Sequence, residues 1–177
     1  MTGRTVLITG ASAGIGKATA NELAARGARV VLLCRNAAKA EGARREVLAR
    51  TPGAAVDVMA LDLRSLASVR ACATAVLAAY PRIDVLVNNA GVFPPMLRTT
   101  ADGFEEQIGV NHLGHFLLTN LLLERLEASA PARVVTVASM MHAMANRLSN
   151  SKHSRGNAGL RVAGGLVIKC SDAAARI

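Results

Sequence analysis

Aromatic residues are almost missing from this chain of 177 residues, which has three Phe, one Tyr and no Trp. Hydrophobic residues nevertheless make up 51% of it, so its core must be built from Ala, Val, Leu and Ile. Such a core is typical of a parallel β-sheet covered by helices on both faces. A chain of this length is long enough for one domain with a substantial core.

Long apolar runs and a paired set of cysteines are also missing. No stretch of about 18 apolar residues occurs, which predicts no membrane span, and the first apolar run, 6–8, starts too early for a signal peptide. The three cysteines, Cys34, Cys72 and Cys170, are odd in number and scattered, which argues against a disulfide framework. We therefore expect a cytoplasmic location.

Acidic residues are scarce beside basic ones, with 12 Asp and Glu against 21 Lys and Arg. The excess is concentrated in residues 146–177, which hold six basic residues and one acidic residue. A basic segment can bind nucleic acid or an anionic membrane surface, but this one has no aromatic residues for base stacking. We predict a folded domain over 1–145 and a basic, disordered tail over 146–177.

Strands and helices alternate along the first 138 residues. The pattern predicts strands over 6–8, 29–34, 55–61, 83–87 and 133–137, and helices over 17–26, 37–50, 65–80 and 103–129. Five short apolar strands joined by helices predict an α/β fold with a doubly wound parallel sheet that is incomplete after the fifth strand. Ligands of such sheets bind at the carboxyl ends of the strands.

A glycine-rich turn, Thr9 to Gly16, joins the first predicted strand to the first predicted helix and reads TGASAGIG. Glycine permits a tight turn and lets backbone N–H groups reach a phosphate, while the helix N-terminus adds partial positive charge. A strand before the turn and a helix after it favour a dinucleotide site over an ordinary turn. We therefore predict a Rossmann-like fold whose first turn holds a pyrophosphate.

The end of the second predicted strand, Cys34-Arg35-Asn36, indicates which dinucleotide is bound. An NAD site usually has an acidic residue there to hold the ribose hydroxyls, and none is present. Arg35 can pair with a 2′-phosphate and stack on the adenine. The sequence favours NADP(H) over NAD(H); alternatively, Arg35 is a solvated charge at the strand end.

These motifs, in this order, resemble the short-chain dehydrogenase/reductase family over residues 3 to about 143. The match rests on residues 9–16, Asp62-Leu63, Asn88-Asn89-Ala90-Gly91, the segment VNHLGHF at 110–116 and the segment RVVTVAS at 133–139. The chain is most similar to the retinol-dehydrogenase-like branch, which includes the members called dehydrogenase/reductase member 13. The resemblance implies an oxidoreductase that transfers hydride between a nicotinamide and an alcohol or carbonyl substrate, such as a retinoid.

The resemblance also implies roles for single residues. Ser139 would hydrogen-bond the substrate carbonyl, Asn111 would order a water in a proton relay, and Asp62 would lie against the adenine. The predicted cofactor-binding residues are Thr9, Gly10, Ser12, Ala13, Gly14, Ile15, Gly16, Arg35, Asp62, Leu63, Asn88, Ala90 and Gly91. For Ser139, Asp62 and the segment 88–91 the alternative is a purely structural turn.

Two histidines three residues apart, His112 and His115, have a spacing that metal ligands can use on a helix. No cysteine or carboxylate accompanies them, so the sequence favours packing or surface positions and no metal site.

The proton donor of the family is missing from this chain. A tyrosine followed four residues later by a lysine should come about a dozen residues after Ser139, yet the one tyrosine is Tyr80. Lys152 lies at a suitable distance, but Leu148 stands where the tyrosine should be. We expect impaired catalysis; the alternative is a non-catalytic, NADP(H)-binding truncated paralogue or isoform. An alternative transcript, a shifted frame or a truncated gene model could each give this end.

In the family, the helix that carries the missing Tyr and Lys covers the sheet and forms much of a dimer interface. Without that helix, we expect the fifth strand to be an exposed edge. The expected partner is a small alcohol or carbonyl substrate if the chain is active, with homo-oligomers expected of the full-length family and nucleic acid disfavoured.

Overall fold

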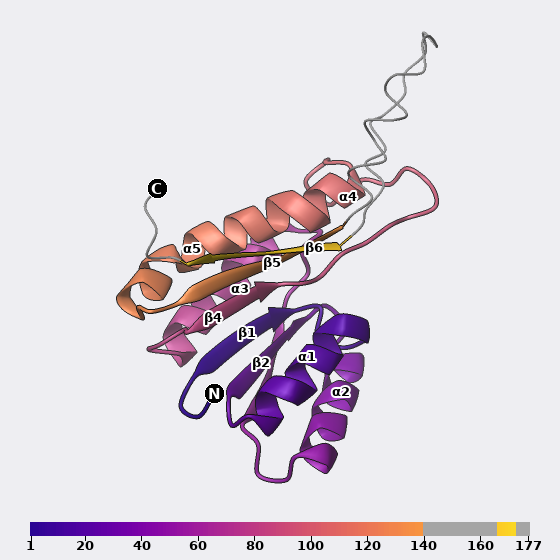
Figure 1. Ribbon diagram of the computed structural model, residues 1–177. Helices are drawn as coiled ribbons and strands as arrows, with labels where there is room; N and C mark the ends of the chain where they lie inside the picture. The colour runs from indigo at the N-terminus through magenta and orange to yellow at the C-terminus, as the bar shows by residue number, and fades with distance from the viewer. Residues whose placement is uncertain (140–165, 173–177) are drawn as a thin grey trace, which may run out of the picture.

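The structure is a computed structural model that describes residues 1–139 and the backbone of 166–172 (Figure 1). One sheet of six strands runs through it in the order β3-β2-β1-β4-β5-β6. The strands β1 (Thr5–Thr9), β2 (Arg29–Cys34), β3 (Val56–Ala60), β4 (Val85–Asn88) and β5 (Arg133–Ser139) are parallel. This confirms the predicted α/β class with a doubly wound parallel sheet.

Helices cover both faces of the sheet (Figure 1). On one face lie α1 (Gly14–Ala25) and α2 (Ala37–Arg50), and on the other lie α3 (Leu66–Ala79) and α5 (His115–Ala128). Alternate strand residues divide between two cores, because Val6 and Ile8 pack toward α1 and α2 whereas Leu7 packs toward α3 and α5. Among the described Phe and Tyr residues, the one buried side chain is that of Tyr80. None of the described helices is long and apolar enough to cross a membrane.

The single helix predicted over 103–129 is instead three consecutive elements. A short α4 (Glu106–Ile108) is followed by a π-helix, η1 (Gly109–Gly114), and then by α5. The helix begins later than predicted because Thr99 pairs with Glu105 in an isolated bridge, and the Glu105 carboxylate caps the amides of Gln107 and Ile108. The π-helix contains two buried glycines, and a Cβ on Gly114 would lie 3.0 Å from the Leu63 carbonyl oxygen.

The carboxyl-terminal part of the chain also differs from the prediction. Strand β6 (Leu166–Asp172) pairs antiparallel with β5, so β5 is not the exposed edge that the sequence suggested. The physical reason is that an unpaired strand edge is a template for pairing, and residues 166–168 (Leu-Val-Ile) are an apolar run with two β-branched residues. The remainder of the predicted tail, with Leu148 and Lys152, lies outside the described residues.

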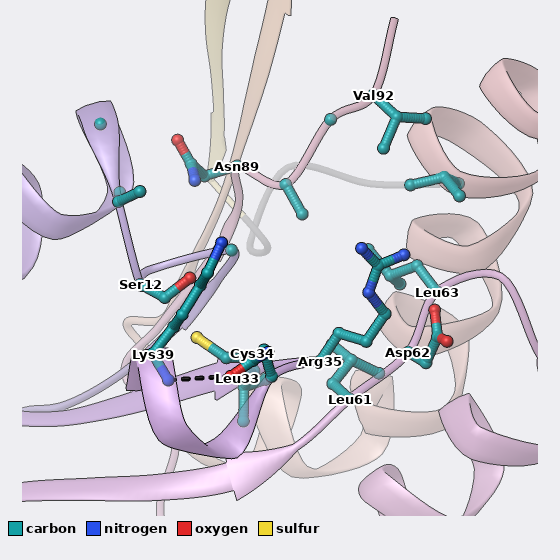
Figure 2. A pocket seen from close by; sticks show the side chains of 18 of the residues that line it. Ser12, Leu33, Cys34, Arg35, Lys39, Leu61, Asp62, Leu63, Asn89 and Val92 are labelled. Carbon is teal, nitrogen blue, oxygen red and sulfur yellow. Dashed lines mark hydrogen bonds between the residues drawn. The ribbon is translucent and has the colours of Figure 1, made fainter. Parts of the chain in front are cut away.

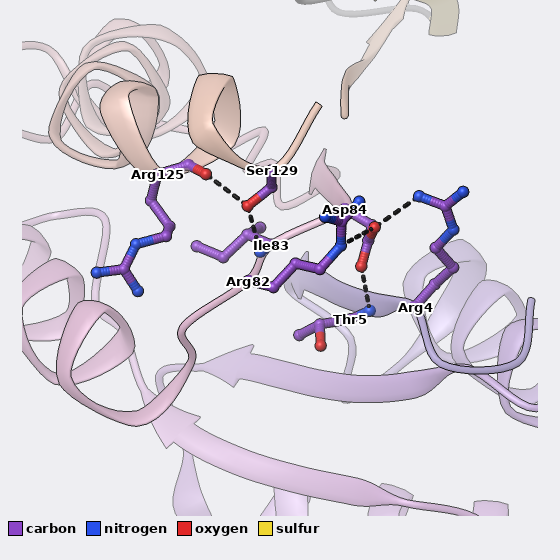
Figure 3. Close-up of polar contacts among 7 residues, drawn as sticks. All are labelled: Arg4, Thr5, Arg82, Ile83, Asp84, Arg125 and Ser129. Carbon is purple, nitrogen blue, oxygen red and sulfur yellow. Dashed lines mark hydrogen bonds and ion pairs between the residues drawn. The ribbon is translucent and has the colours of Figure 1, made fainter. Parts of the chain in front are cut away.

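At the amino ends of β1 and β4, a buried carboxylate ties the two strands together (Figure 3). Asp84 accepts hydrogen bonds from Arg4 at 2.7 Å, from Arg82 at 2.8 Å and from the Thr5 amide at 2.8 Å. Burial alone would raise the pKa of Asp84, but these hydrogen bonds together hold the pKa below its usual value. Beside it, the Ser129 hydroxyl accepts from the Ile83 amide and donates to the Arg125 carbonyl.

Candidate functional site

A cavity of about 710 Å³ lies at the opposite end of the sheet, at the carboxyl ends of the strands. The strand order reverses between β1 and β4, which is where doubly wound sheets bind ligands. The cavity is lined by the glycine-rich turn, the end of β2, the segment after β3 and the segment after β4 (Figure 2). Predicted cofactor-binding residues on this lining are Gly10, Ser12, Ala13, Gly14, Ile15, Gly16, Arg35, Asp62, Leu63, Ala90 and Gly91.

Two glycines of the turn are required by close backbone contacts. Gly10 has a φ of +66°, and a Cβ there would lie 2.8 Å from the Ala90 Cα. A Cβ on Gly16 would lie 2.5 Å from the Asn89 side-chain nitrogen Nδ2 and 2.9 Å from the Gly10 carbonyl oxygen. Gly10 therefore lies close to the backbone of the segment after β4, and Gly16 lies close to the Asn89 side chain of that segment.

The N-terminus of α1 faces this cavity without a capping side chain. Its N-cap residue, Ala13, makes no side-chain hydrogen bond, and no acidic residue occurs in the first turn. Helix N-termini normally have a Ser, Thr, Asp or Asn to accept the first amide hydrogens. Here those amides and the partial positive charge of the helix end are left for an anion.

Two cations project into the cavity from the region after β2. The Lys39 side chain extends past Ser12, and the Arg35 side chain extends toward Asp62 and Leu63 (Figure 2). Lys39 was missed by the sequence analysis, although it lies in the first turn of α2, where its amide is capped by Asn36. Both cations are exposed, so they are accessible to a ligand.

Among the described residues, one acidic residue, Asp62, lines the cavity, against the three cations Arg35, Lys39 and Arg64. The Asp62 carboxylate accepts a hydrogen bond from the Arg64 amide at 3.0 Å, which stabilises the turn after β3. The Arg64 guanidinium lies 3.2 Å from the buried carboxylate of Glu106. The lining thus carries an excess of positive charge, which suits an anionic ligand.

Two predicted cofactor-binding residues, Thr9 and Asn88, lie behind the lining instead of on it. Thr9 is fully buried, and its hydroxyl oxygen accepts hydrogen bonds from the amides of Asn89 and Ala90, each at 2.9 Å. The Asn88 side chain donates to the Thr119 hydroxyl at 3.0 Å. Both residues support the wall formed by the segment after β4.

The catalytic residues implied by the resemblance occupy different surroundings. The Asn111 side chain, in the π-helix, exchanges hydrogen bonds with Val92: its oxygen accepts from the Val92 amide at 2.8 Å and its nitrogen donates to the Val92 carbonyl at 3.0 Å. Ser139 is the last residue of β5 and pairs with Leu166, but its side chain lies outside the described residues. Their catalytic roles stay predictions.

The two histidines differ sharply. His112 is exposed, whereas His115 is 5% exposed, and burial lowers the pKa of His115 to about 4. His115 Nε2 lies 2.9 Å from the Thr9 hydroxyl oxygen, and Nδ1 lies 3.2 Å from the Asn111 carbonyl oxygen. Within the part of the chain that the structure describes, no group of three His, Cys, Asp or Glu side chains could hold a metal ion.

Comparison with known proteins decides the family. The profile described as short chain dehydrogenase matches residues 4–151. The chain belongs to the short-chain dehydrogenase/reductase family. It is 51% identical to human retinol dehydrogenase 13 and 55% identical to human retinol dehydrogenase 12, each over 140 residues and 79% of this chain. These matches cover 42% and 44% of the relatives, so the chain spans less than half of their length.

A solved structure is similar over the same region. The complex of RhlG with NADP from Pseudomonas aeruginosa superposes with a TM-score of 0.66 at 34% identity, covering 76% of this chain and 54% of that one. Retinol dehydrogenases and other oxidoreductases of this family are thus the relatives of the chain, as the sequence motifs predicted.

Proposed function

We propose that this chain binds NADP(H) in the cavity at the carboxyl ends of β1, β2 and β4. The observation that carries the proposal is the uncapped N-terminus of α1, preceded by two glycines at which a Cβ would lie 2.8 Å from the Ala90 Cα (Gly10) and 2.9 Å from the Gly10 carbonyl oxygen (Gly16). A pyrophosphate supplies the acceptors that these amides lack. The cavity volume of about 710 Å³ lies in the range of small-molecule sites.

The preference for NADP(H) is supported by Arg35 and Lys39. Both line the cavity beyond the end of β2, where NAD sites carry an acidic residue for the ribose hydroxyls. A guanidinium can form two parallel hydrogen bonds with a 2′-phosphate, and an ammonium adds a second positive charge. The relative with NADP in its active site is consistent with this preference.

In an active member of the family, the bound cofactor supplies or accepts a hydride. The residues of this chain would hold the diphosphate on the turn 9–16 and the adenosine end between Arg35 and Asp62. Gly91, Val92 and Val110 would form the wall toward the reacting end. We infer an alcohol or carbonyl substrate, with the retinoids named by the curated relatives as the first class to test.

We further propose that this chain by itself is a poor catalyst or a non-catalytic NADP(H) binder. Its one tyrosine, Tyr80, follows α3 at the amino end of the sheet and donates to Asp57 at 3.0 Å. Burial, reinforced by the Asp57 carboxylate, raises the pKa of Tyr80 to about 12, which disfavours proton exchange at neutral pH. No other tyrosine in the sequence could serve as the acid.

Fluorescence titration of the purified chain with NADPH and NADH tests the binding proposal. We expect saturable binding of NADPH and weaker binding of NADH. Replacing Arg35 and Lys39 together by leucine should reduce NADPH affinity by about tenfold or more and leave NADH affinity nearly unchanged. Lys17→Leu is the matched control, because Lys17 is paired with Glu46 on the surface. Equal affinity for the two cofactors would overturn the NADP(H) preference.

Turnover separates the two functions. Oxidation of NADPH should be followed with retinaldehyde and a panel of short aldehydes, with Ser139→Ala as the control. A rate that exceeds background and is lost in Ser139→Ala would establish an active enzyme without the family tyrosine. Binding without such a rate would establish the non-catalytic alternative.

A further inference from the structure

One buried residue outside the cavity, His115, contacts both the end of β1 and the π-helix. His115 is the first residue of α5, and its ring contacts Thr9 at the end of β1 and the Asn111 carbonyl in the π-helix. The hydrogen bonds form a closed network: Thr9 bonds the amides of Asn89 and Ala90, Asn111 bonds the amide of Val92, and His115 bonds the carbonyl of Asn111. The segment 89–92, which forms one wall of the cavity, is part of this network.

The numbers of donors and acceptors determine where the protons lie in this hydrogen-bond network. A carbonyl oxygen only accepts, so His115 Nδ1 must carry a proton in order to bond the Asn111 carbonyl. In a neutral imidazole Nε2 is then an acceptor, and the Thr9 hydroxyl donates its single proton to it over 2.9 Å. The competing acceptor, the Val87 carbonyl, is farther at 3.4 Å. Both lone pairs of the Thr9 oxygen are thereby free for the two backbone amides.

A charged imidazole would not fit the same arrangement. Its Nε2 would donate to the Thr9 oxygen, which would then face three donors with two lone pairs. The charge would also be buried with no carboxylate among its hydrogen-bond partners. The groups facing the ring are therefore consistent with a neutral His115 protonated at Nδ1.

We propose that His115 is a positioning residue for the cofactor site: by accepting a hydrogen bond from the Thr9 hydroxyl, it holds the segment 89–92 against the glycine-rich turn. The segment packs closely on the glycine-rich turn, because a Cβ on Gly10 would lie 2.8 Å from the Ala90 Cα and a Cβ on Gly16 would lie 2.5 Å from Asn89 Nδ2. The consequence for NADP(H) rests on the proposed function, whereas the hold itself is a property of the chain without cofactor.

Two substitutions distinguish hydrogen bonding from packing. His115→Gln keeps an acceptor for the Thr9 hydroxyl but loses ring volume, whereas His115→Phe keeps the ring and loses the acceptor. Amide hydrogen exchange at Asn89 and Ala90, measured by NMR without cofactor, is the readout. We expect exchange to accelerate about tenfold in His115→Phe and little in His115→Gln, since the acceptor for the Thr9 hydroxyl is lost only in the former. A residue that only fills space would give the opposite order.

The control is His112→Gln, which changes an exposed histidine of the neighbouring turn and should leave both amides protected. The imidazole ¹⁵N shifts of the wild-type chain should show His115 protonated at Nδ1 and bare at Nε2. A proton on Nε2, or unchanged exchange in His115→Phe, overturns the proposal.

Cofactor affinity separates this proposal from the proposed function. NADPH affinity should fall about tenfold in His115→Phe and be retained in His115→Gln. Unchanged affinity in His115→Phe, in a wild-type chain that binds NADPH, refutes the positioning of the cofactor site. If the wild-type chain does not bind NADPH but the exchange pattern is found, the proposed function fails and the hold on 89–92 stands.

Discussion

At the amino ends of β1 and β4, the Asp84 carboxylate accepts three hydrogen bonds and forms ion pairs with two arginines. At the carboxyl ends of the same strands, the N-terminus of α1 has no capping side chain, and Arg35 and Lys39 are exposed beside the cavity. At the amino ends, the chain itself supplies the hydrogen-bond donors to the buried carboxylate. At the carboxyl ends, uncapped backbone amides and cations surround a cavity.

The amino ends of β1 and β4 therefore contribute to the stability of the fold, and the carboxyl ends contribute to ligand binding. Satisfied buried polar groups rigidify a structure, whereas unsatisfied ones cost free energy unless a ligand supplies their partners. Substitutions at the amino end should therefore change the free energy of unfolding and leave NADPH affinity intact. Substitutions at the carboxyl end should change NADPH affinity.

The largest effect is expected for Gly10→Ala at the carboxyl end. The new Cβ would combine a left-handed φ with a 2.8 Å approach to the Ala90 Cα, so the segment after β4 must move. We expect a loss of about 3 kcal/mol in the free energy of unfolding, measured with urea, together with loss of detectable NADPH binding.

Gly53→Ala is the matched control for Gly10→Ala. Gly53 also has a positive φ, +81°, but a Cβ there meets no atom within 4 Å. It should cost only about 1 kcal/mol and leave NADPH affinity unchanged. Equal effects of the two substitutions would mean that backbone strain, and not the contact across the cavity wall, makes Gly10 necessary.

The next effect is expected for Asp84→Ala at the amino end. This change leaves Arg4, Arg82 and the Thr5 amide without their shared acceptor, and it should lower the free energy of unfolding by about 2 kcal/mol. NADPH affinity, measured by fluorescence well below the unfolding midpoint, should stay within about twofold of wild type. A large loss of affinity would show that the two ends are coupled, and the contrast would fail.

An effect of similar size is expected for the pH dependence at the carboxyl end. His115 has a pKa of about 4 in the folded chain, below the value of about 6.5 in an unfolded chain. The unfolded chain therefore binds more protons between these values, and stability falls as the pH drops from 6.5 toward 4. From pH 7 to pH 5 the free energy of unfolding should fall by about 2 kcal/mol more in wild type than in His115→Gln.

Asp84 has the same sign over a different range. Its pKa is lowered, so its contribution is present above about pH 4, the pKa of an unfolded aspartate, and is lost as the pH falls through the folded value. Asp84→Ala should therefore keep the slope of wild type between pH 7 and pH 5. A changed slope in that range would contradict the assignment of the slope to His115.

Local signals explain what the sequence could predict. Helix α2 spans Ala37–Arg50 as predicted, because Asn36 caps it and residues 51–53 (Thr-Pro-Gly) end it. Ser65, where the third helix was predicted to begin, caps α3 by accepting a hydrogen bond from the Ser68 amide. Alternation of apolar strands with helices likewise gave the parallel sheet, and the glycine-rich turn gave the position of the cavity.

Contacts between distant segments explain what the sequence could not predict. The π-helix depends on buried Gly114 packing against Leu63, and the role of His115 depends on Thr9, 106 residues earlier. Strand β6 depends on the free edge of β5, and the short apolar run 166–168 alone does not indicate that the segment pairs there. Lys39 points into the cavity only because α2 begins beside β2, and a lysine on a helix gives no signal of this.

Chemical-shift mapping of NADPH binding tests the contrast between the two ends most directly. In a ¹⁵N-labelled chain titrated with NADPH, we predict saturable chemical-shift changes at the backbone amides of Ser12, Gly14, Gly16 and Arg35. We predict none at Thr5, Asp84 or Ser129. Shifts confined to the amino end of the sheet, or no saturable shift at the glycine-rich turn, would contradict this prediction.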